Sequence, residues 1–154
     1  MNTDTILRKA SIKDVQQIKN LVNRFATTGK MLPLSLHEIY DYLRNFWIYE
    51  EKKEIVATCA LFICWDDLAE IRSLAVLKKF WQRGIGTKLV NVALSEAKAL
   101  SINKVFVLTY KTDFFEKLGF NKIDKSDLPH KVWASCLKCS KFPGCDEIAM
   151  IRSI

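Results

Sequence analysis

The hydrophobic positions along the chain change their period several times, and each period predicts an element. Residues 4–9, DTILRK, read as a short opening strand. From Ser11 the apolar residues recur every three or four positions, which predicts an amphipathic helix that ends near Gly29. The apolar face of this helix consists of Ile12, Val15, Ile18, Leu21, Val22 and Phe25.

A second helix and a run of strands follow. Ser35 and Glu38 have the spacing of a capping box, so a short helix begins there. Residues 46–50 and 54–65 are apolar segments separated by the charged turn EKK, which predicts an antiparallel hairpin. Residues 68–76, LAEIRSLAV, extend this meander by a third strand.

The second half of the chain alternates between strands and helices. A long helix is predicted from about Thr87 to Leu100, a buried strand at 104–110 and a short helix at 113–118. FNKI and the final EIAMIRSI predict two more strands. Strands first, then strand–helix–strand, indicate the α/β (α+β) class, built on a mixed sheet.

Length and composition indicate one ordinary globular domain. The 154 residues contain no linker, repeat or low-complexity stretch, so residues 1–154 are predicted to form a single domain. No apolar run approaches the roughly 20 residues that cross a bilayer. The N-terminus MNTDTILRKA lacks the apolar stretch of a signal peptide, so we expect a cytoplasmic protein with no membrane partner.

Charge and cysteines each suggest a type of ligand. The net charge, 24 − 17 = +7, favours an anionic partner such as a nucleic acid or a phosphorylated small molecule. Cys136, Cys139 and Cys145, with His130 upstream, form a candidate structural zinc set, although only one CxxC pair is present. The alternative is that these are reduced thiols that pack in a loop.

Two glycines one residue apart, in WQRGIG at residues 81–86, precede the long helix. Bare backbone at a strand-to-helix junction allows N–H groups to approach a phosphate, and the helix N-terminus adds a partial positive charge. Arg83 and Lys88 add formal charge. Leu89 excludes the dinucleotide fingerprint, and Trp81 and Thr87 exclude the P-loop. The segment is therefore either a pyrophosphate site for another ligand class or an ordinary loop with two turn glycines.

The flanking segments carry a family resemblance. LAV (74–76), WQRGIG (81–86) and FFEKLGF (114–120) stand in the order found in the GNAT superfamily of acetyl-CoA-dependent N-acetyltransferases, which the chain therefore resembles. EIRSLAV, LPHKVWASC and CSKFPGCDEIAM extend the resemblance to short, single-domain N-acetylglutamate synthases of arginine biosynthesis. The resemblance implies a GNAT fold: a mixed, mostly antiparallel central sheet flanked by helices, with splayed parallel strands at the acetyl-CoA site.

The resemblance also implies which residues bind acetyl-CoA. The strand ending in LAV would line the pantetheine arm, the glycine loop would wrap the pyrophosphate, and the helix of FFEKLGF would lie beside the thioester. Trp81 stands where the family usually has arginine or glutamine. The implied cofactor-binding residues are Leu74, Ala75, Val76, Trp81, Gln82, Arg83, Gly84, Ile85, Gly86, Thr87 and Phe115.

Glu70 and Arg72 are the candidate residues for acceptor chemistry. An amino acid must lose an ammonium proton before it attacks the thioester, so a general base is useful. Glu70 stands where many GNAT enzymes have that base, and Arg72 shares its strand face. Arg72 either pairs with Glu70 or grips a substrate carboxylate. The structural alternative for Glu70 is an exposed or ion-paired carboxylate.

The leaving thiolate lacks the usual acid. Phe115 stands where many GNAT enzymes have a proton-donating tyrosine. A free thiol has a pKa of about 8.5, so its thiolate leaves tolerably without protonation. Tyr110 is a candidate donor, with a packing or rim role as the alternative. Backbone N–H groups near Leu74 and Val76 would polarise the thioester carbonyl.

The leading hypothesis is transfer of acetyl from acetyl-CoA to L-glutamate, and no metal is assigned to catalysis. A second hypothesis changes the acceptor to another small amine, and a third makes the protein a non-catalytic acetyl-CoA sensor. A basic nucleic-acid-binding module is the alternative from another class, but the lysines are scattered along the chain, so we expect no nucleic-acid partner. The helices near residues 35–45 offer a surface for a homodimer.

Overall fold

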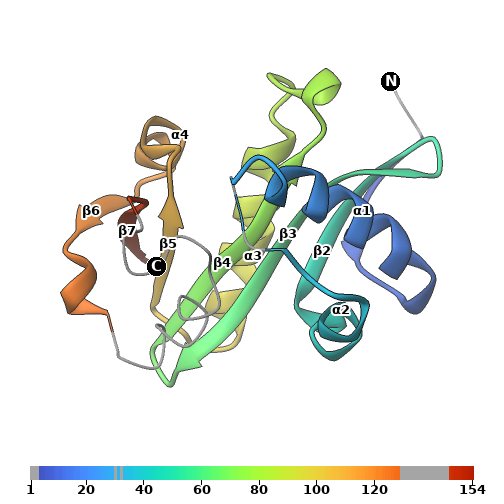
Figure 1. Ribbon diagram of the computed structural model, residues 1–154. Coiled ribbons are helices and arrows are strands. Elements are labelled where there is room, and N and C mark those ends of the chain that lie inside the picture. Colours follow the sequence, from blue (N-terminus) through green and yellow to red (C-terminus); the bar gives the residue numbers. More distant parts are fainter. Residues whose placement is uncertain (1–3, 30, 32, 129–145) are drawn as a thin grey trace. The chain divides into compact units, whose positions relative to one another are not determined.

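The computed structural model describes residues 4–29, 31, 33–128 and 146–154 (Figure 1). Seven strands form a sheet with the hydrogen-bonded order β1-β2-β3-β4-β5-β7-β6. The strands are β1 (Thr5–Lys9), β2 (Phe46–Glu51), β3 (Glu54–Trp65), β4 (Leu68–Val76), β5 (Lys104–Thr109), β6 (Asn121–Ile123) and β7 (Ile148–Ser153). The α-helices are α1 (Val15–Ala26), α2 (Leu36–Asp41), α3 (Ile85–Ala99) and α4 (Thr112–Lys117).

Each strand and helix predicted from the hydrophobic pattern is present, with shifts of a few residues at the ends. Short 3-10 turns that the pattern did not predict occur at η1 (Ile12–Asp14), η2 (Leu43–Asn45), η3 (Lys78–Phe80) and η4 (Lys125–Asp127). Within the described part of the chain, no helix has both the length and the apolar character needed to cross a membrane.

The chain divides into two compact units. The first comprises Met1–Leu61 and Ile71–Glu96, and the second comprises Phe62–Glu70 and Ala97–Ile154. In the first unit, β2 pairs antiparallel with both β1 and β3. Figure 1 shows α1 in front of these strands and α3 behind them. Most of the apolar face predicted for α1 is buried there: Val15, Ile18, Leu21 and Val22. The prediction was wrong for Ile12, which lies in the 3-10 turn before the helix and is 65% exposed, and Phe25 is only half-buried. On α3, Leu89, Val90 and Ala93 are buried.

The predicted capping box of the second helix is present. The Ser35 hydroxyl accepts a hydrogen bond from the Glu38 amide, and the Glu38 carboxylate accepts one from the Ser35 amide. Such a cap stabilises a helix by about 1 kcal/mol. The entry to α2 is held by Asn23, whose amide side chain donates to and accepts from the backbone of Leu34. This bond tethers α1 to the segment before α2.

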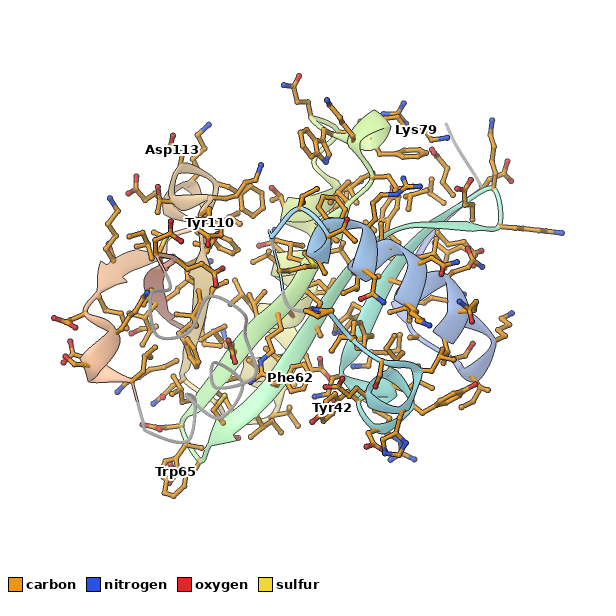
Figure 2. All side chains as sticks on the ribbon, in the orientation of Figure 1. Tyr42, Phe62, Trp65, Lys79, Tyr110 and Asp113 are labelled. Atoms are coloured by element: carbon orange, nitrogen blue, oxygen red, sulfur yellow. The ribbon has the colours of Figure 1, made fainter. Side chains whose placement is uncertain are left out.

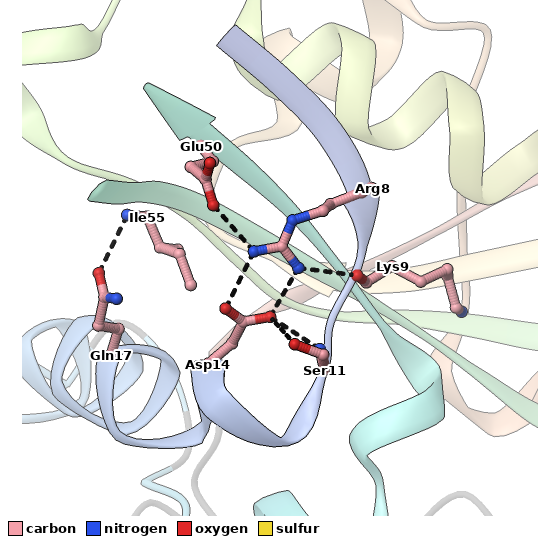
Figure 3. Close-up of polar contacts among 7 residues, drawn as sticks. All are labelled: Arg8, Lys9, Ser11, Asp14, Gln17, Glu50 and Ile55. Carbon is pink, nitrogen blue, oxygen red and sulfur yellow. Dashed lines mark hydrogen bonds and ion pairs between the residues drawn. The ribbon is translucent and has the colours of Figure 1, made fainter. Parts of the chain in front are cut away.

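A buried ion-pair network joins β1, η1 and β2 (Figure 3). Arg8 Nη1 and Nη2 lie 2.7 and 3.0 Å from the two carboxylate oxygens of Asp14, and Nη2 lies 2.9 Å from Glu50 Oε1. The backbone N–H and hydroxyl of Ser11 also donate to Asp14. Asp14 is only 2% exposed, and the Arg8 guanidinium lowers the pKa of its carboxyl from 3.8 to about 2. Arg8 therefore fixes the start of α1 against the strands.

In the second unit, β7 pairs antiparallel with β5 on one side and β6 on the other. A hydrophobic cluster consisting of Cys64, Leu68, Phe106, Leu128 and Ala149 packs beside these strands. Arg152 of β7 donates from Nη1 to the carbonyl of Leu118 at 2.7 Å. The carbonyls at the end of a helix lack intrahelical partners, so this bond stabilises the end of α4.

The turn between β2 and β3 is a site where stability can be improved. Lys52 and Lys53 have φ values of 51° and 65°, a conformation that Asn-Gly adopts far more readily than lysine. We expect Lys52→Asn with Lys53→Gly to raise the free energy of unfolding by about 1–2 kcal/mol in urea titrations. Replacing both lysines with alanine is the control, since it removes the charge without relieving the backbone. An equal gain in that control would contradict the explanation from backbone conformation.

Candidate active site

The glycine loop before α3 is shaped by its backbone conformation. Gly84 has a φ of +76°, and a Cβ placed on it would meet no atom within 4 Å. The first bond of the helix runs from the Lys88 amide to the Gly84 carbonyl at 3.0 Å, so Gly84 is the N-cap. The N–H groups of residues 85–87 lie in the first turn, ahead of that bond, where the helix supplies no carbonyl for them. They form a cradle suited to a phosphate.

Side chains of the first unit hold this loop in place. The Trp81 indole nitrogen donates to the Val76 carbonyl at 2.6 Å, which closes the loop between β4 and α3. This bond gives Trp81 a structural role in the loop. The cations of Lys79 and Arg83 lie 5.3 and 5.0 Å from the centre of the Phe80 ring, which is buried. Figure 2 shows Lys79 on this loop.

A pocket of about 540 Å³ opens beside the glycine loop within the same unit. Arg83 lies 3.8 Å from Glu51 across it, and its side chain is 55% exposed. An exposed pair at this distance contributes little to stability, so the guanidinium can turn toward an incoming anion at small cost. The lining residues are Glu51, Lys52, Glu54, Lys79, Phe80 and Arg83. Three of these six side chains are cationic and two are carboxylates, so the lining carries an excess of one positive charge.

The strand β4 contains the predicted base and its neighbour. Glu70 is one of the few charged residues that are buried, with 6% exposure, and Arg72 is half-buried on the same strand. A buried carboxylate is costly unless it is paired or used, so the structure argues against an exposed surface role for Glu70. Leu74 and Val76 are half-buried, whereas Ala75 between them is buried. This alternation is that of a strand with one packed face and one accessible face.

Ser73 interrupts this strand. Its φ of +53° lies in the left-handed region, which non-glycine residues seldom adopt within a strand. The buried Thr58 on β3 donates from its hydroxyl to the Ser73 carbonyl at 2.9 Å. Serine carries no sequence signal for this conformation. Strained backbone of this kind gathers at functional sites, which makes the segment from Ser73 to Val76 a candidate part of the site.

The second unit contains Tyr110 and Phe115. The Tyr110 hydroxyl donates to Asp146 Oδ1 at 2.7 Å, which joins the end of β5 to the residues before β7. Phe115 is 2% exposed and contacts Phe114 and Phe120 edge to face, with ring centres 5.0 and 5.2 Å apart. Phe115 is therefore a packing residue, which agrees with its lack of a titratable group.

The predicted zinc set lies outside the described residues, since Cys136, Cys139 and Cys145 all fall between residues 129 and 145. Among the residues that the structure describes, no cluster of histidine, cysteine or acidic side chains could hold a metal ion. Cys59 and Cys64 on β3 are buried thiols outside any disulfide. Burial raises the pKa of the Cys59 thiol to about 12, so it is inert at neutral pH.

Sequence reasoning did not identify Thr58, Ser73 or Asp146 as members of the site. Thr58 reads as an ordinary strand residue, and Ser73 sits between a candidate substrate residue and the LAV segment without any turn signal. Asp146 directly follows Cys145 and carries no sequence signal of its own. Each of the three acts through a contact between segments distant in sequence, and such contacts leave no local pattern.

The sequence profile of the Acetyltransferase (GNAT) family matches residues 15–120. An uncharacterized N-acetyltransferase of Chlorobaculum tepidum is 38% identical over 151 residues, which cover 98% of this chain and 97% of the relative. An amino-acid acetyltransferase of Mycobacterium tuberculosis is 36% identical over 132 residues, 83% of this chain and 75% of the relative.

Two solved structures share the fold. A Mycobacterium tuberculosis protein in complex with CoA and the ligand NLQ superposes with a TM-score of 0.82 and 29% identity, over 97% of this chain and 99% of that one. The N-acetylglutamate synthase of Neisseria gonorrhoeae, complexed with coenzyme A and N-acetyl-glutamate, superposes with a TM-score of 0.87 and 21% identity. That match covers 99% of this chain but 36% of the longer protein, and at this identity it shows the fold alone.

The GNAT profile spans more than half of this chain. The relative from Chlorobaculum tepidum matches 98% of this chain. The predicted GNAT fold, a mixed seven-stranded sheet flanked by helices, is confirmed by the strand order and by the structural matches. The chain therefore belongs to the GNAT family of acetyltransferases, and it is an acyltransferase that uses acetyl-CoA to acetylate an amine.

Proposed function

We propose that the protein transfers the acetyl group of acetyl-CoA to the α-amino group of L-glutamate, giving N-acetyl-L-glutamate and CoA. The observation that carries this proposal is the match to an amino-acid acetyltransferase over 83% of the chain at 36% identity. The choice of glutamate as the amino acid rests on the resemblance of the motifs EIRSLAV, LPHKVWASC and CSKFPGCDEIAM to those of N-acetylglutamate synthases. The reaction would serve arginine biosynthesis in the cytoplasm.

The first unit supplies the proposed acetyl-CoA site. The N–H groups of residues 85–87 at the start of α3 would bind the pyrophosphate, and Gly84 leaves room for it because its open side has no neighbour within 4 Å. Arg83 would add a formal positive charge once it turns away from Glu51. The segment from Leu74 to Val76 would run beside the pantetheine arm, with backbone N–H groups that polarise the thioester carbonyl.

The acceptor nitrogen loses two protons and one bond is exchanged. The first proton leaves the ammonium before attack, and the second passes to solvent or to the departing thiolate as the tetrahedral intermediate collapses. Glu70 would accept a proton from the glutamate ammonium, directly or through water, and the neutral amine would attack the carbonyl carbon of the thioester. Collapse of the tetrahedral intermediate breaks the carbon–sulfur bond and releases the CoA thiolate. Arg72 would hold a substrate carboxylate by a bidentate pair, a geometry that the guanidinium fork suits and ammonium does not.

The CoA thiolate can leave without a proton donor from the protein. Phe115 is buried and cannot donate a proton. Tyr110 donates its own proton to Asp146, so it would protonate sulfur only after its hydroxyl turns away from that carboxylate. Since thiolate is a tolerable leaving group, we propose that solvent supplies the proton in most turnovers, with Tyr110 as the candidate donor from the protein.

The test is release of CoA thiol from acetyl-CoA, measured with each of the twenty amino acids and several polyamines as acceptor. We expect turnover with L-glutamate at least tenfold above any other acceptor, because a site in which Arg72 pairs with the side-chain carboxylate rejects acceptors that leave this guanidinium contact unmade. D-Glutamate and N-methyl-glutamate are matched controls for the position and substitution of the amine.

Other outcomes of the panel would revise the proposal in defined ways. Turnover confined to another amine would keep the acetyltransferase and change the acceptor. Binding of acetyl-CoA without turnover on any acceptor would favour a sensor. The homodimer predicted from the surface near residues 35–45 is a separate proposal, and sedimentation of the purified protein tests it.

A further inference from the structure

The backbone of β4 departs from an extended conformation at a single residue, Ser73. Its φ is +53°, whereas the strand otherwise runs from Leu68 to Val76 as one element. The sequence places no glycine, asparagine or aspartate there, although these are the residues that adopt positive φ readily. A strained residue persists only where its surroundings hold it in place. The structure must therefore contain a group that fixes Ser73.

Thr58 is that group. It lies on β3, has 0% exposure, and donates from its hydroxyl to the Ser73 carbonyl at 2.9 Å. Thr58 is one of four buried polar or charged residues in the described chain, beside Asp14, Glu70 and Thr109. A strand position facing a packed interior would ordinarily carry valine, which has the same shape. Burying a hydroxyl costs free energy unless it is hydrogen-bonded. Among the described residues, the Ser73 carbonyl is the one hydrogen-bond partner of the Thr58 hydroxyl.

The consequence of Ser73 falls on the residues that follow it. A left-handed residue redirects the backbone, so the orientation of the N–H groups at Leu74 and Val76 depends on the ψ and φ values held at Ser73. These are the N–H groups proposed above to polarise the thioester carbonyl. Hydrogen-bond donors act on a transition state only when they are held in the right direction beforehand.

We infer that Thr58 is a positioning residue for acetyl transfer: its hydroxyl holds Ser73 in the left-handed conformation that aims the N–H groups of residues 74–76. This inference rests on the proposed function of the site. It is separate from the roles of Glu70 and Arg72, because Thr58 is buried on the neighbouring strand and touches no substrate.

The test compares two substitutions that differ by one group. Thr58→Val keeps the shape and removes the hydroxyl, whereas Thr58→Ser keeps the hydroxyl and removes a methyl. We expect Thr58→Val to lower kcat about tenfold while the KM for acetyl-CoA changes by less than about twofold, because the donors matter more in the transition state than in the ground state. Thr58→Ser should keep kcat within about threefold of the wild type.

A second comparison uses the backbone itself. Glycine reaches positive φ without help, so in a Ser73→Gly background we expect Thr58→Val to lower kcat by no more than about twofold. Ile18→Val, a buried change on α1, is the control for loss of stability alone, and it should leave kcat unchanged. A tenfold loss that persists in the Ser73→Gly background would overturn the inference, as would equal losses in Thr58→Ser and Thr58→Val.

An independent readout separates this inference from the proposed function. Acetyl-CoA is titrated into ¹⁵N-labelled wild-type protein and into Thr58→Val, and the amide shifts of Leu74 and Val76 are followed. We expect large shifts in the wild type and shifts less than half as large in the variant. If no amino acid is acetylated but this difference appears, the proposed function fails and the positioning role stands. Equal shifts in both proteins would overturn the positioning role whatever the acceptor.

Discussion

Glu70→Gln is expected to lower kcat for glutamate acetylation by about 10²- to 10⁴-fold, the range by which general base catalysis contributes to such reactions. Glutamine has nearly the shape of glutamate and keeps one acceptor oxygen, but it cannot take a proton from the substrate ammonium. Glu70 is 6% exposed, so the substitution removes a buried charge while adding no volume. The KM for acetyl-CoA should change little, because the cofactor contacts are made by other residues.

The pH dependence gives the sharper measurement. In the Glu70→Gln enzyme the free amine of glutamate becomes the limiting species, so we expect kcat/KM to rise about tenfold per pH unit from pH 7 to 9, more steeply than in the wild type. Asp66→Asn, which neutralises an exposed carboxylate in the turn between β3 and β4, is the control and should behave like the wild type. A Glu70→Gln enzyme with more than half of the wild-type kcat would remove Glu70 from the mechanism.

Asp14→Asn is expected to have the largest effect on stability, a loss of about 2–4 kcal/mol in the free energy of unfolding at pH 7. The carboxylate is 2% exposed and receives two bonds from Arg8 and two from Ser11. Asparagine has one acceptor oxygen where aspartate has two, so it cannot accept all four of these hydrogen bonds. The half-buried guanidinium of Arg8 then keeps Glu50 as its remaining acidic partner.

The same pair predicts how stability depends on pH. The pKa of Asp14 is lowered from 3.8 to about 2 in the folded protein, chiefly by the hydrogen bond from Arg8. A lowered pKa contributes stability that is fully present above the unfolded value and is lost as the pH falls toward the folded one. The difference between wild type and Asp14→Asn should therefore be constant above about pH 5 and shrink between about pH 4 and pH 2.

Urea titrations at several pH values measure this difference. Asp41→Asn is the control, because Asp41 is 58% exposed and its pair with His37 lies on the surface. Such pairs contribute at most about 1 kcal/mol, so the control should follow the wild type closely. A difference between wild type and Asp14→Asn that stays unchanged down to pH 2 would show that lost packing, and not the lost charge, explains the destabilisation.

The elements of the fold could be predicted because their signals are local. The three- and four-residue spacing of α1 and the Ser35–Glu38 capping box needed no knowledge of distant residues, and both are present. The boundary of α3 was less accurate: the helix was expected from about Thr87, but it begins at Ile85. Gly84, with its positive φ, ends the loop before the helix, so Gly86 lies within the first turn.

The candidate site was only partly predictable. The loop and the two β4 residues followed from motif order, whereas the groups that hold them do not lie near them in sequence. Thr58 is 15 positions from Ser73, and Tyr110 is 36 positions from Asp146. The pairing of Arg8 with Glu50 spans 42 positions. These three contacts depend on the register in which the strands pair. A single sequence determines that register only through all of the strand pairings together.

The strand β3 contains one buried cysteine thiol in each of the two units, and each thiol can report on the unfolding of its unit. Cys59 belongs to the first unit and Cys64 to the second, five residues apart on one strand, and both thiols are buried. A buried thiol reacts with an alkylating reagent only when its surroundings open, so its labelling rate reports the free energy of that opening. With the three cysteines between residues 129 and 145 replaced by serine, equal labelling rates at the two positions would mean that the units unfold together. Unequal rates would mean that the boundary between two folding units crosses a continuous strand.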